Sequence, residues 1–133
     1  MATGEVQFVW KHLAFLGDES QWAAEASECA SEQGRFWEYH DRLFAETQGR
    51  GKGVFEKPRL KQYAADVGLD RDAFAACLDS GRYTARVRAA TEDARRAGVD
   101  RTPTLEINGE RLVGATLEQV RAAVERAKVR EKS

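Results

Sequence analysis

The sequence predicts an α+β fold in which helices outnumber strands. Between residues 18 and 97 apolar residues recur at intervals of three and four, which is the period of an amphipathic helix. From Gly98 to Gly114 apolar and polar residues instead alternate around an Asn108-Gly109 pair, a pattern typical of a β-hairpin. At 133 residues the chain is long enough for one domain with its own core.

A strand is predicted over Glu5–Lys11, ahead of the helices. Its residues alternate between two faces, and one face carries large apolar side chains, Val6, Phe8 and Trp10. Because the opposite face carries Val9 between Gln7 and Lys11, we expect both faces of this strand to be partly covered.

Two of the five expected helices follow this strand. Asp18 with Gln21 caps the first, which extends to about Glu32. Gln33-Gly34 separates it from the second, which carries aromatic and apolar residues at helical spacing: Phe36, Trp37, His40, Leu43 and Phe44. We expect all three tryptophans of the chain to belong to the core rather than to a binding platform; they are Trp10, Trp22 and Trp37.

The other three helices have clear start and stop signals. Pro58 suits the first position of the third helix, and Gly68 ends it. Asp70 caps the fourth helix, and Gly98 stops the fifth, which begins near Thr84. Their expected inward residues are Leu60, Tyr63, Ala64, Val67, Phe74, Cys77, Leu78, Val87, Ala90 and Ala94.

A hairpin and one more helix complete the predicted order. The hairpin pairs Thr104–Asn108 with Glu110–Val113 across a type I′ turn at Asn108-Gly109. Thr116 and Gln119 then form a capping box. The helix that it opens has an apolar face, Leu117, Val120 and Val124, and is expected to fray after Ala127.

Composition excludes several classes of partner. The 21 basic and 22 acidic residues are interspersed and give a net charge of −1, so we expect no nucleic-acid or anionic-membrane surface. No apolar run approaches the roughly 20 residues of a membrane span. Two histidines and two cysteines scattered over four elements predict no metal site. The N-terminal residues lack a signal-peptide pattern, so we expect a cytosolic protein or one whose beginning has been removed.

Three blocks of the sequence carry a resemblance to a known family. In chain order they are Ser20–Phe44, Leu60–Gly81 and Gly98–Gly109. They resemble the first inserted helices, the next helical pair, and the cis-proline loop with its hairpin in the bacterial DsbA-like thiol-disulfide oxidoreductases. The resemblance runs from Glu5 to about Ala127.

The resemblance implies a thioredoxin-like fold with a helical insertion. It implies a single domain over residues 1–133, with the strand at 5–11, the insertion at 18–97, and the cis-proline loop, hairpin and last helix at 98–127. The family also has an N-terminal strand and an active-site helix bearing Cys-x-x-Cys. This sequence has only Cys29 and Cys77, so by this resemblance it lacks that first part.

The resemblance also implies a function for the parent protein. A DsbA-like parent exchanges thiols and disulfides with protein or peptide substrates and needs no cofactor; we expect this chain alone to be inactive. Two alternatives stay open: a non-enzymatic module that binds a peptide or partner chain, and a relative of the glutathione-linked isomerases. The family implies an extracytoplasmic parent, periplasmic or secreted, or a cytoplasmic one if no upstream signal exists.

The two cysteines have two competing interpretations. Each lies on an apolar helical stripe, so they are either two buried thiols or, as in some relatives, a structural disulfide between Cys29 and Cys77. The disulfide is the favoured interpretation. Closing a loop of roughly 49 residues stabilises by about 4 kcal/mol in the chain-entropy model, and it implies an oxidising compartment.

The loop Arg101-Thr102-Pro103 is the candidate substrate-binding segment. In the family, the residue before the cis-proline presents its backbone to an extended substrate, so Thr102 is expected to do so here and the Thr102–Pro103 bond to be cis. Arg101 stands where the family usually has glycine. The alternative is that Pro103 only shapes the loop.

The resemblance also leaves two strand edges without a neighbour. The family's missing strand would lie between Glu5–Lys11 and Thr104–Asn108, so both edges would carry unpaired backbone groups. We therefore expect these strands to pair directly, to aggregate, or to recruit another chain, with a homodimer through the open edges as one outcome.

Overall fold

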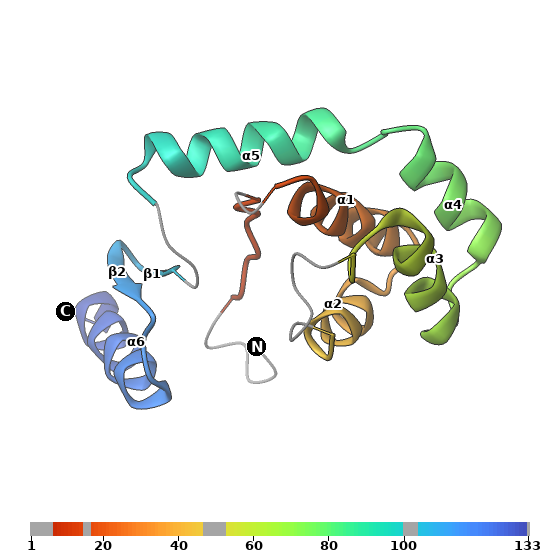
Figure 1. Ribbon diagram of the computed structural model, residues 1–133. Coiled ribbons are helices and arrows are strands. Elements are labelled where there is room, and N and C mark those ends of the chain that lie inside the picture. The colour runs from red at the N-terminus through yellow and green to blue at the C-terminus, as the bar shows by residue number, and fades with distance from the viewer. Residues whose placement is uncertain (1–6, 15–16, 47–52, 100–103, 133) are drawn as a thin grey trace. The chain divides into compact units, whose positions relative to one another are not determined.

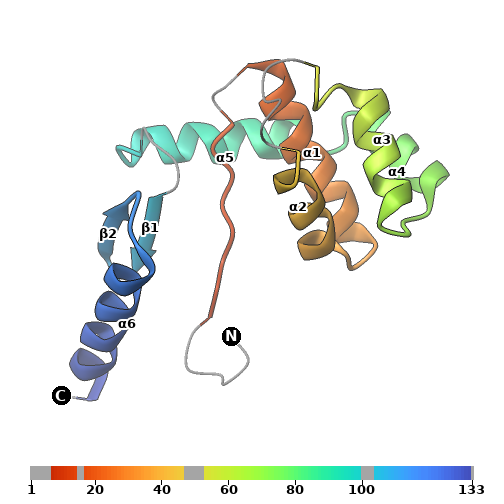
Figure 2. The ribbon, with the colours of Figure 1, turned by 60° about the horizontal axis from the view of Figure 1, so that its bottom comes forward.

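In the residues that it describes, the computed structural model contains eight regular elements: six helices and the two strands of one hairpin. It describes residues 7–14, 17–46, 53–99 and 104–132, the side chains of residues 130–132 excepted. In chain order the elements are α1 (Asp18–Glu32), α2 (Phe36–Phe44), α3 (Lys57–Asp66), α4 (Arg71–Asp79), α5 (Thr84–Arg96), β1 (Thr104–Ile107), β2 (Glu110–Val113) and α6 (Leu117–Lys132) (Figures 1 and 2). The predicted helix-dominant α+β class is confirmed.

The chain separates into two compact units. The first comprises Met1–Asp93 and contains α1 to α4 with most of α5; the second comprises Ala94–Ser133 and contains the hairpin and α6. The two units are therefore described one at a time, and the single-domain organisation stays a prediction.

The core of the first unit forms where α1 packs on α2 and α4, and α3 packs on α4. Its fully buried side chains include Leu60 and Phe74, and the Tyr39 hydroxyl is satisfied by donating to the Leu60 carbonyl oxygen at 2.8 Å. The cluster comprises Ala26, Cys29, Ala30, Tyr39, Leu43, Val54, Phe55, Leu60, Tyr63, Ala64, Leu69, Phe74, Cys77 and Leu78. The inward faces predicted for the third and fourth helices supply six of these residues: Leu60, Tyr63, Ala64, Phe74, Cys77 and Leu78.

One of two predicted N-caps is confirmed and the other is wrong. Asp70 caps α4 as predicted, since its carboxylate accepts a hydrogen bond from the Ala73 amide at 3.0 Å. The capping role predicted for Asp18 is wrong: Gly17 is the N-cap, with φ at 89° and no side-chain bond, and Asp18 is the first helical residue. A glycine adopts that φ without strain, and Asp18 still favours the positive end of the helix dipole.

The prediction that all three tryptophans belong to the core is wrong for two of them. Trp10 is 39% exposed and Trp37 is 45% exposed, whereas Trp22 packs against the core cluster. Helix α2 turns Tyr39 and Leu43 toward the core. The stripe that begins at Phe36 and continues through His40 lies roughly 100° round the helix from that buried face, so it stays partly exposed.

The strand predicted over Glu5–Lys11 is also wrong where the structure describes it. Residues 7–11 run without helical turns and take part in no sheet, and Glu5 and Val6 lie outside the described residues (Figures 1 and 2). The sheet found in the described part of the chain consists of β1 and β2 alone. A strand is defined by its backbone partners, and residues 7–11 have none there.

The second unit contains the predicted hairpin. Ile107 pairs with Glu110 and Thr104 with Val113, so β1 and β2 are antiparallel across a two-residue turn. Asn108 at φ 48° and Gly109 at φ 92° have the two positive φ angles that a type I′ turn needs, as predicted.

Helix α6 begins as predicted but extends further. The Thr116 hydroxyl accepts from the Gln119 amide at 3.2 Å, while the Gln119 side chain accepts from the Thr116 amide at 2.8 Å, which is the expected capping box. Ala123 and Ala127 are its buried residues, and Leu117 is 66% exposed rather than inward. Beyond Ala127, where fraying is expected, α6 continues to Lys132, and no glycine or proline follows Gly114.

Candidate functional site

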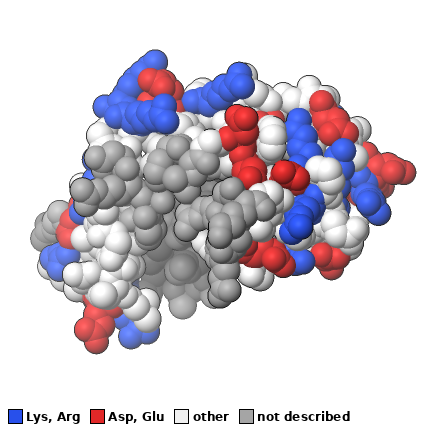
Figure 3. Space-filling view, viewed as in Figure 1, with Lys and Arg blue, Asp and Glu red and all other residues white. Residues whose placement is uncertain are grey.

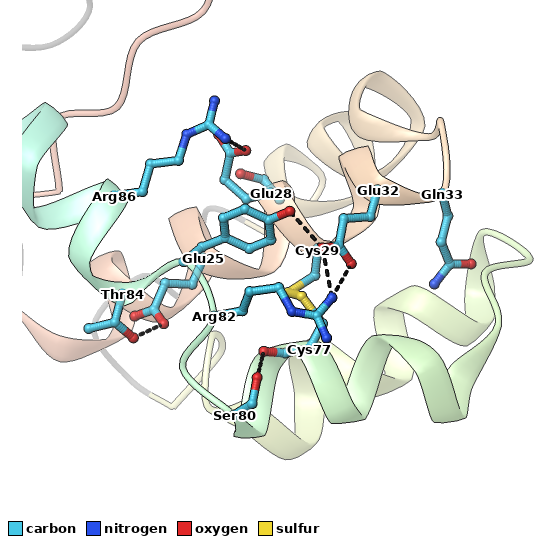
Figure 4. Close-up of a disulfide and its surroundings, with 12 residues drawn as sticks. Glu25, Glu28, Cys29, Glu32, Gln33, Cys77, Ser80, Arg82, Thr84 and Arg86 are labelled. Carbon is cyan, nitrogen blue, oxygen red and sulfur yellow. Dashed lines mark hydrogen bonds and ion pairs between the residues drawn. A yellow bond between two sulfur atoms is a disulfide. The ribbon is translucent and has the colours of Figure 1, made fainter.

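Cys29 and Cys77 meet between two helices of the first unit. Cys29 lies in the second half of α1, and Cys77 lies in the second half of α4. Their sulfurs are 2.17 Å apart and their Cα atoms 5.9 Å apart, which is a disulfide separation (Figure 4). The helices supply this geometry because Ala26 and Ala30, on the same stripe of α1 as Cys29, are fully buried and allow close approach.

The surroundings of this pair are those of a structural cross-link. Cys29 is 2% exposed and Cys77 is 1% exposed, so an external thiolate has no route to either sulfur. Neither cysteine lies at a helix N-terminus, where the helix dipole would favour a thiolate. The pair therefore joins α1 to α4 and is not placed for thiol-disulfide exchange.

A side-chain clamp holds the same two helices together at the end of α1. The Gln33 side chain donates to the Asp70 carbonyl oxygen at 3.2 Å and accepts from the Asp70 amide at 2.8 Å. Gln33 follows the last residue of α1, and Asp70 is the N-cap of α4, so the clamp fixes the end of one helix to the start of the other.

Beyond α4, an ion pair ties the chain back to α1. Arg82 donates to both oxygens of the Glu32 carboxylate at 2.7 Å (Figure 4). The Tyr83 hydroxyl donates to the same carboxylate at 2.6 Å. The Tyr83 hydrogen bond, followed by the Arg82 hydrogen bond, lowers the pKa of Glu32. The same bond raises the pKa of Tyr83, because it favours the protonated phenol.

Hydrogen bonds to a buried carboxylate link α1 to the start of α5. Glu25 is 5% exposed and accepts hydrogen bonds from the Thr84 hydroxyl and from the Gln21 side chain, the latter at 3.1 Å. Gln21 also donates to the Thr84 carbonyl oxygen at 3.2 Å. Among the contacts described, the Glu25 side chain is therefore satisfied by hydrogen bonds and not by a cation.

His12 anchors the N-terminal segment to the helical unit. The Trp10 indole donates to His12 Nδ1 at 3.3 Å, which leaves the proton on Nε2 to be donated to Glu28 at 2.9 Å. Glu28 also lies 3.9 Å from the Arg86 guanidinium. Two residues further on, the Ala14 amide donates to the buried Thr91 hydroxyl at 3.0 Å.

The predicted substrate-binding residues Arg101, Thr102 and Pro103 lie outside the described residues. The cis state of the Thr102–Pro103 bond therefore stays a prediction. Of the predicted site residues, the structure brings only the two cysteines together among those it describes. It describes this loop only at its ends. The Val99 amide donates to the Ala94 carbonyl oxygen at 2.9 Å, and β1 begins at Thr104.

The sequence did not indicate an exposed aromatic face on the first unit. We use this name for Phe8, Trp10, Phe36, Trp37, His40 and Phe44. Trp10 is its centre, with ring centroids 4.7 Å from His40, 6.0 Å from Phe36 and 6.1 Å from Trp37. Phe8 lies 5.4 Å from Trp37, and Phe44 is 56% exposed. The i, i+4, i+8 spacing of Phe36, His40 and Phe44 indicates that these rings share one side of α2. The spacing alone does not show whether that side of the helix is buried or exposed.

The face of the molecule seen in Figure 3 shows no single-sign charged patch, and the described residues contain no metal-binding cluster. Acidic and basic side chains are intermixed on the side of the molecule seen in Figure 3. Within the described ranges no three histidine, cysteine or carboxylate side chains come together as metal ligands. Over the same residues, no helix is long and apolar enough to cross a membrane.

Comparison with known families gives a match over nearly the whole chain. The family described as thioredoxin matches residues 1–126. Nothing in this match assigns a role to Cys29 or Cys77, but it includes both of them and the loop at 101–103.

Several curated relatives carry the name of an ion transporter. The Na(+)/H(+) antiporter NhaA 3 of Salinispora tropica is 37% identical over 122 residues, which are 90% of this chain and 18% of the relative. The antiporter NhaA of Herminiimonas arsenicoxydans is 35% identical over 111 residues, 84% of this chain and 17% of the relative. The antiporter NhaA 1 of Mycolicibacterium gilvum is 33% identical over 111 residues, which are 80% of this chain and 17% of the relative. The chain spans less than a fifth of the length of these relatives.

Proposed function

Because this chain belongs to the thioredoxin family, we propose that it forms part of a DsbA-like thiol-disulfide oxidoreductase acting on protein or peptide substrates. In such a reaction a thiolate of a redox-active dithiol attacks a substrate disulfide and forms a mixed disulfide. The second thiolate then displaces the reduced substrate. The proposed substrate-side residues of this chain are Arg101, Thr102 and Pro103.

The observation that carries this proposal is the extent of the family match. It runs from residue 1 to residue 126, so it includes the helical unit and the loop before the hairpin. The helical insertion between a first segment and a proline-hairpin-helix ending is the feature by which the sequence resembles the DsbA-like branch.

The chain's own cysteines have a different role in this proposal. Cys29 and Cys77 are buried at disulfide distance from one another, so they staple the helical unit. The redox-active dithiol is supplied by a polypeptide segment other than these 133 residues. The chain alone is therefore expected to have no oxidase or reductase turnover.

Insulin reduction tests the proposal in two steps. The chain alone is assayed first, and turnover that disappears in Cys29→Ala or Cys77→Ala would contradict the structural role of this pair. A Cys-x-x-Cys segment from a thioredoxin-family protein is then fused ahead of Met1. The fusion is expected to be active and to lose most of its activity with Pro103→Ala. A folded fusion with no activity would argue against an oxidoreductase function.

A second candidate is a non-enzymatic interaction module, and the names of the relatives favour it. The chain matches less than a fifth of proteins named Na(+)/H(+) antiporters, so it is comparable to an accessory segment of a transporter. A module of this kind would bind a partner chain without redox turnover. Partner binding by the chain alone, unchanged by Pro103→Ala, combined with an inactive fusion, would favour this candidate. Glutathione-dependent activity in the fusion would instead indicate the isomerase branch.

A further inference from the structure

His12 makes two hydrogen bonds that together fix where its ring carries a proton. The Trp10 indole nitrogen lies 3.3 Å from His12 Nδ1, with the two ring planes at 73° to each other. His12 Nε2 lies 2.9 Å from a carboxylate oxygen of Glu28 on α1. An indole N–H only donates and an ionised carboxylate only accepts, so a neutral ring makes both bonds when its proton is on Nε2.

The surroundings hold this ring in place. His12 is 9% exposed and the Glu28 side chain is 17% exposed, so neither is freely hydrated. After His12 the backbone is fixed to α5, because the Ala14 amide donates to the buried Thr91 hydroxyl at 3.0 Å. A change in the charge of the ring therefore acts mainly on its two bonded partners and less on solvent.

Adding a proton to His12 changes its two bonds in opposite directions. The proton is taken from solvent and is bound by Nδ1, the ring nitrogen that carries no proton, which can then no longer accept from the Trp10 indole. At Nε2 the bond to Glu28 becomes an ion pair, and charge-assisted hydrogen bonds are stronger than neutral ones. Burial disfavours a charged ring, whereas the adjacent carboxylate favours it. Histidine is the side chain that ordinarily changes charge between about pH 5 and 8, so this is the range in which the change is sought.

Charged and titratable groups on two other helices also face these side chains. Arg86 on α5 lies 3.9 Å from the second oxygen of Glu28 and is 69% exposed, so solvent screens its effect on that carboxylate (Figure 4). On α2, the His40 ring centroid lies 4.7 Å from that of Trp10, and His40 Nδ1 lies 3.1 Å from the Asp41 carboxylate. His40 is therefore a second histidine whose charge acts on Trp10, and a test has to separate the two histidines.

We propose that His12 is a pH-dependent switch, which binds the Trp10 indole when it is neutral and releases it when it is protonated. In the neutral state a chain of hydrogen bonds from Trp10 through His12 to Glu28 ties the segment before α1 to the helical unit. In the protonated state His12 stays paired with Glu28, and the indole N–H loses its acceptor. All three side chains belong to the first unit, so the switch needs no second molecule and does not depend on the redox reaction proposed above.

A pH titration of the 15N-labelled full chain by NMR tests this switch. Between about pH 5 and 8 the Trp10 indole cross-peak should shift along a one-proton curve whose midpoint equals that of the His12 ring. At the high-pH end, the 15N shifts of the His12 ring should show the proton on Nε2. The Trp22 indole is an internal reference: its ring packs against the core cluster and faces the Lys57 ammonium group, so it should not follow this curve.

His12→Gln and His40→Gln form a matched pair of variants, since each replaces a titrating ring by the same neutral amide. His12→Gln should abolish the shift of the Trp10 indole with this midpoint, whereas His40→Gln should retain it. Glu28→Gln removes the carboxylate that favours the charged ring, so it should move the midpoints of the indole and of His12 to lower pH together. Trp10→Phe identifies the indole cross-peak.

Four results would overturn the proposal, and the first two come from the unaltered chain. A Trp10 indole cross-peak that does not titrate with His12 shows that the charge of the ring does not control this bond. A neutral His12 ring with its proton on Nδ1 excludes the indole as its donor. An indole shift that persists in His12→Gln and disappears in His40→Gln assigns the response to His40. A midpoint that Glu28→Gln leaves unchanged excludes Glu28 as the partner of the protonated ring.

Discussion

Reducing the Cys29–Cys77 pair should destabilise the first unit by a large and calculable amount. The two residues are 48 positions apart, so the cross-link closes a loop whose entropy in the unfolded chain corresponds to about 4 kcal/mol in the chain-entropy model. Reduction removes the bond without removing any heavy atom, so it creates no cavity at sites that are 2% and 1% exposed. The expected loss is therefore about 2–4 kcal/mol, where the lower value allows for structure that persists in the unfolded state.

Urea unfolding followed by far-UV circular dichroism measures this loss. Oxidised and reduced wild type are compared with the double variant Cys29→Ala/Cys77→Ala, whose stability should not respond to reductant. Alkylation in denaturant, read by mass spectrometry, should label both cysteines only after reduction. Labelling without reductant would show that the bond does not form in the isolated protein. A fully reduced protein whose unfolding free energy changes by less than about 1 kcal/mol would refute the loop-entropy reasoning.

Three further perturbations probe single contacts of the helical unit. Asp70→Ala removes the N-cap bond of α4 and should lower the unfolding free energy by about 1 kcal/mol. The control Asp72→Ala, in the exposed first turn of the same helix, should change it by about 0.5 kcal/mol or less, and thermal melts of the two variants compare the effects. Tyr39→Phe deletes a buried hydroxyl that donates to the Leu60 carbonyl oxygen and should cost about 1–2 kcal/mol in urea unfolding. Because the pKa of Glu32 is lower in the folded protein than its ordinary value of 4.5, its stabilising effect is present above that value and is lost as pH falls through the folded pKa. The stability advantage of wild type over Glu32→Gln should therefore shrink below pH 4.5, and an advantage independent of pH would contradict this assignment.

Features that depend on neighbouring residues could be predicted from the sequence. The Asp70 cap, the Thr116–Gln119 capping box and the Asn108-Gly109 turn each involve groups no more than three positions apart. Their geometry is set by the local backbone, and tertiary packing has little influence on it. The same holds for the end of α3, where Gly68 adopts a φ of 79° that glycine readily adopts.

Features that depend on distant partners could not be predicted in this way. Residues 7–11 have the alternation of a strand, but alternation does not supply the neighbouring backbone that a sheet requires. Helix α2 has two adjacent apolar stripes, and contacts with α1 and α3 decide that Tyr39 and Leu43 are buried while Trp37 and Phe44 are not. The pairing expected for Cys29 and Cys77 came from the family resemblance, since spacing alone allows two separate buried thiols.

The cross-link and the exposed aromatic face are physically connected. Cys29 and the Gln33–Asp70 clamp hold α1 against α4, and α1 in turn provides the surface on which Tyr39 and Leu43 of α2 are buried. The aromatic stripe of α2 is therefore presented from a helix whose position is already fixed. A partner that covers this face orders only side chains and the short segment before His12, so little conformational entropy opposes binding. The cross-link, although remote from the aromatic rings, thus fixes the helix that carries them, and its reduction should lower the stability of the first unit.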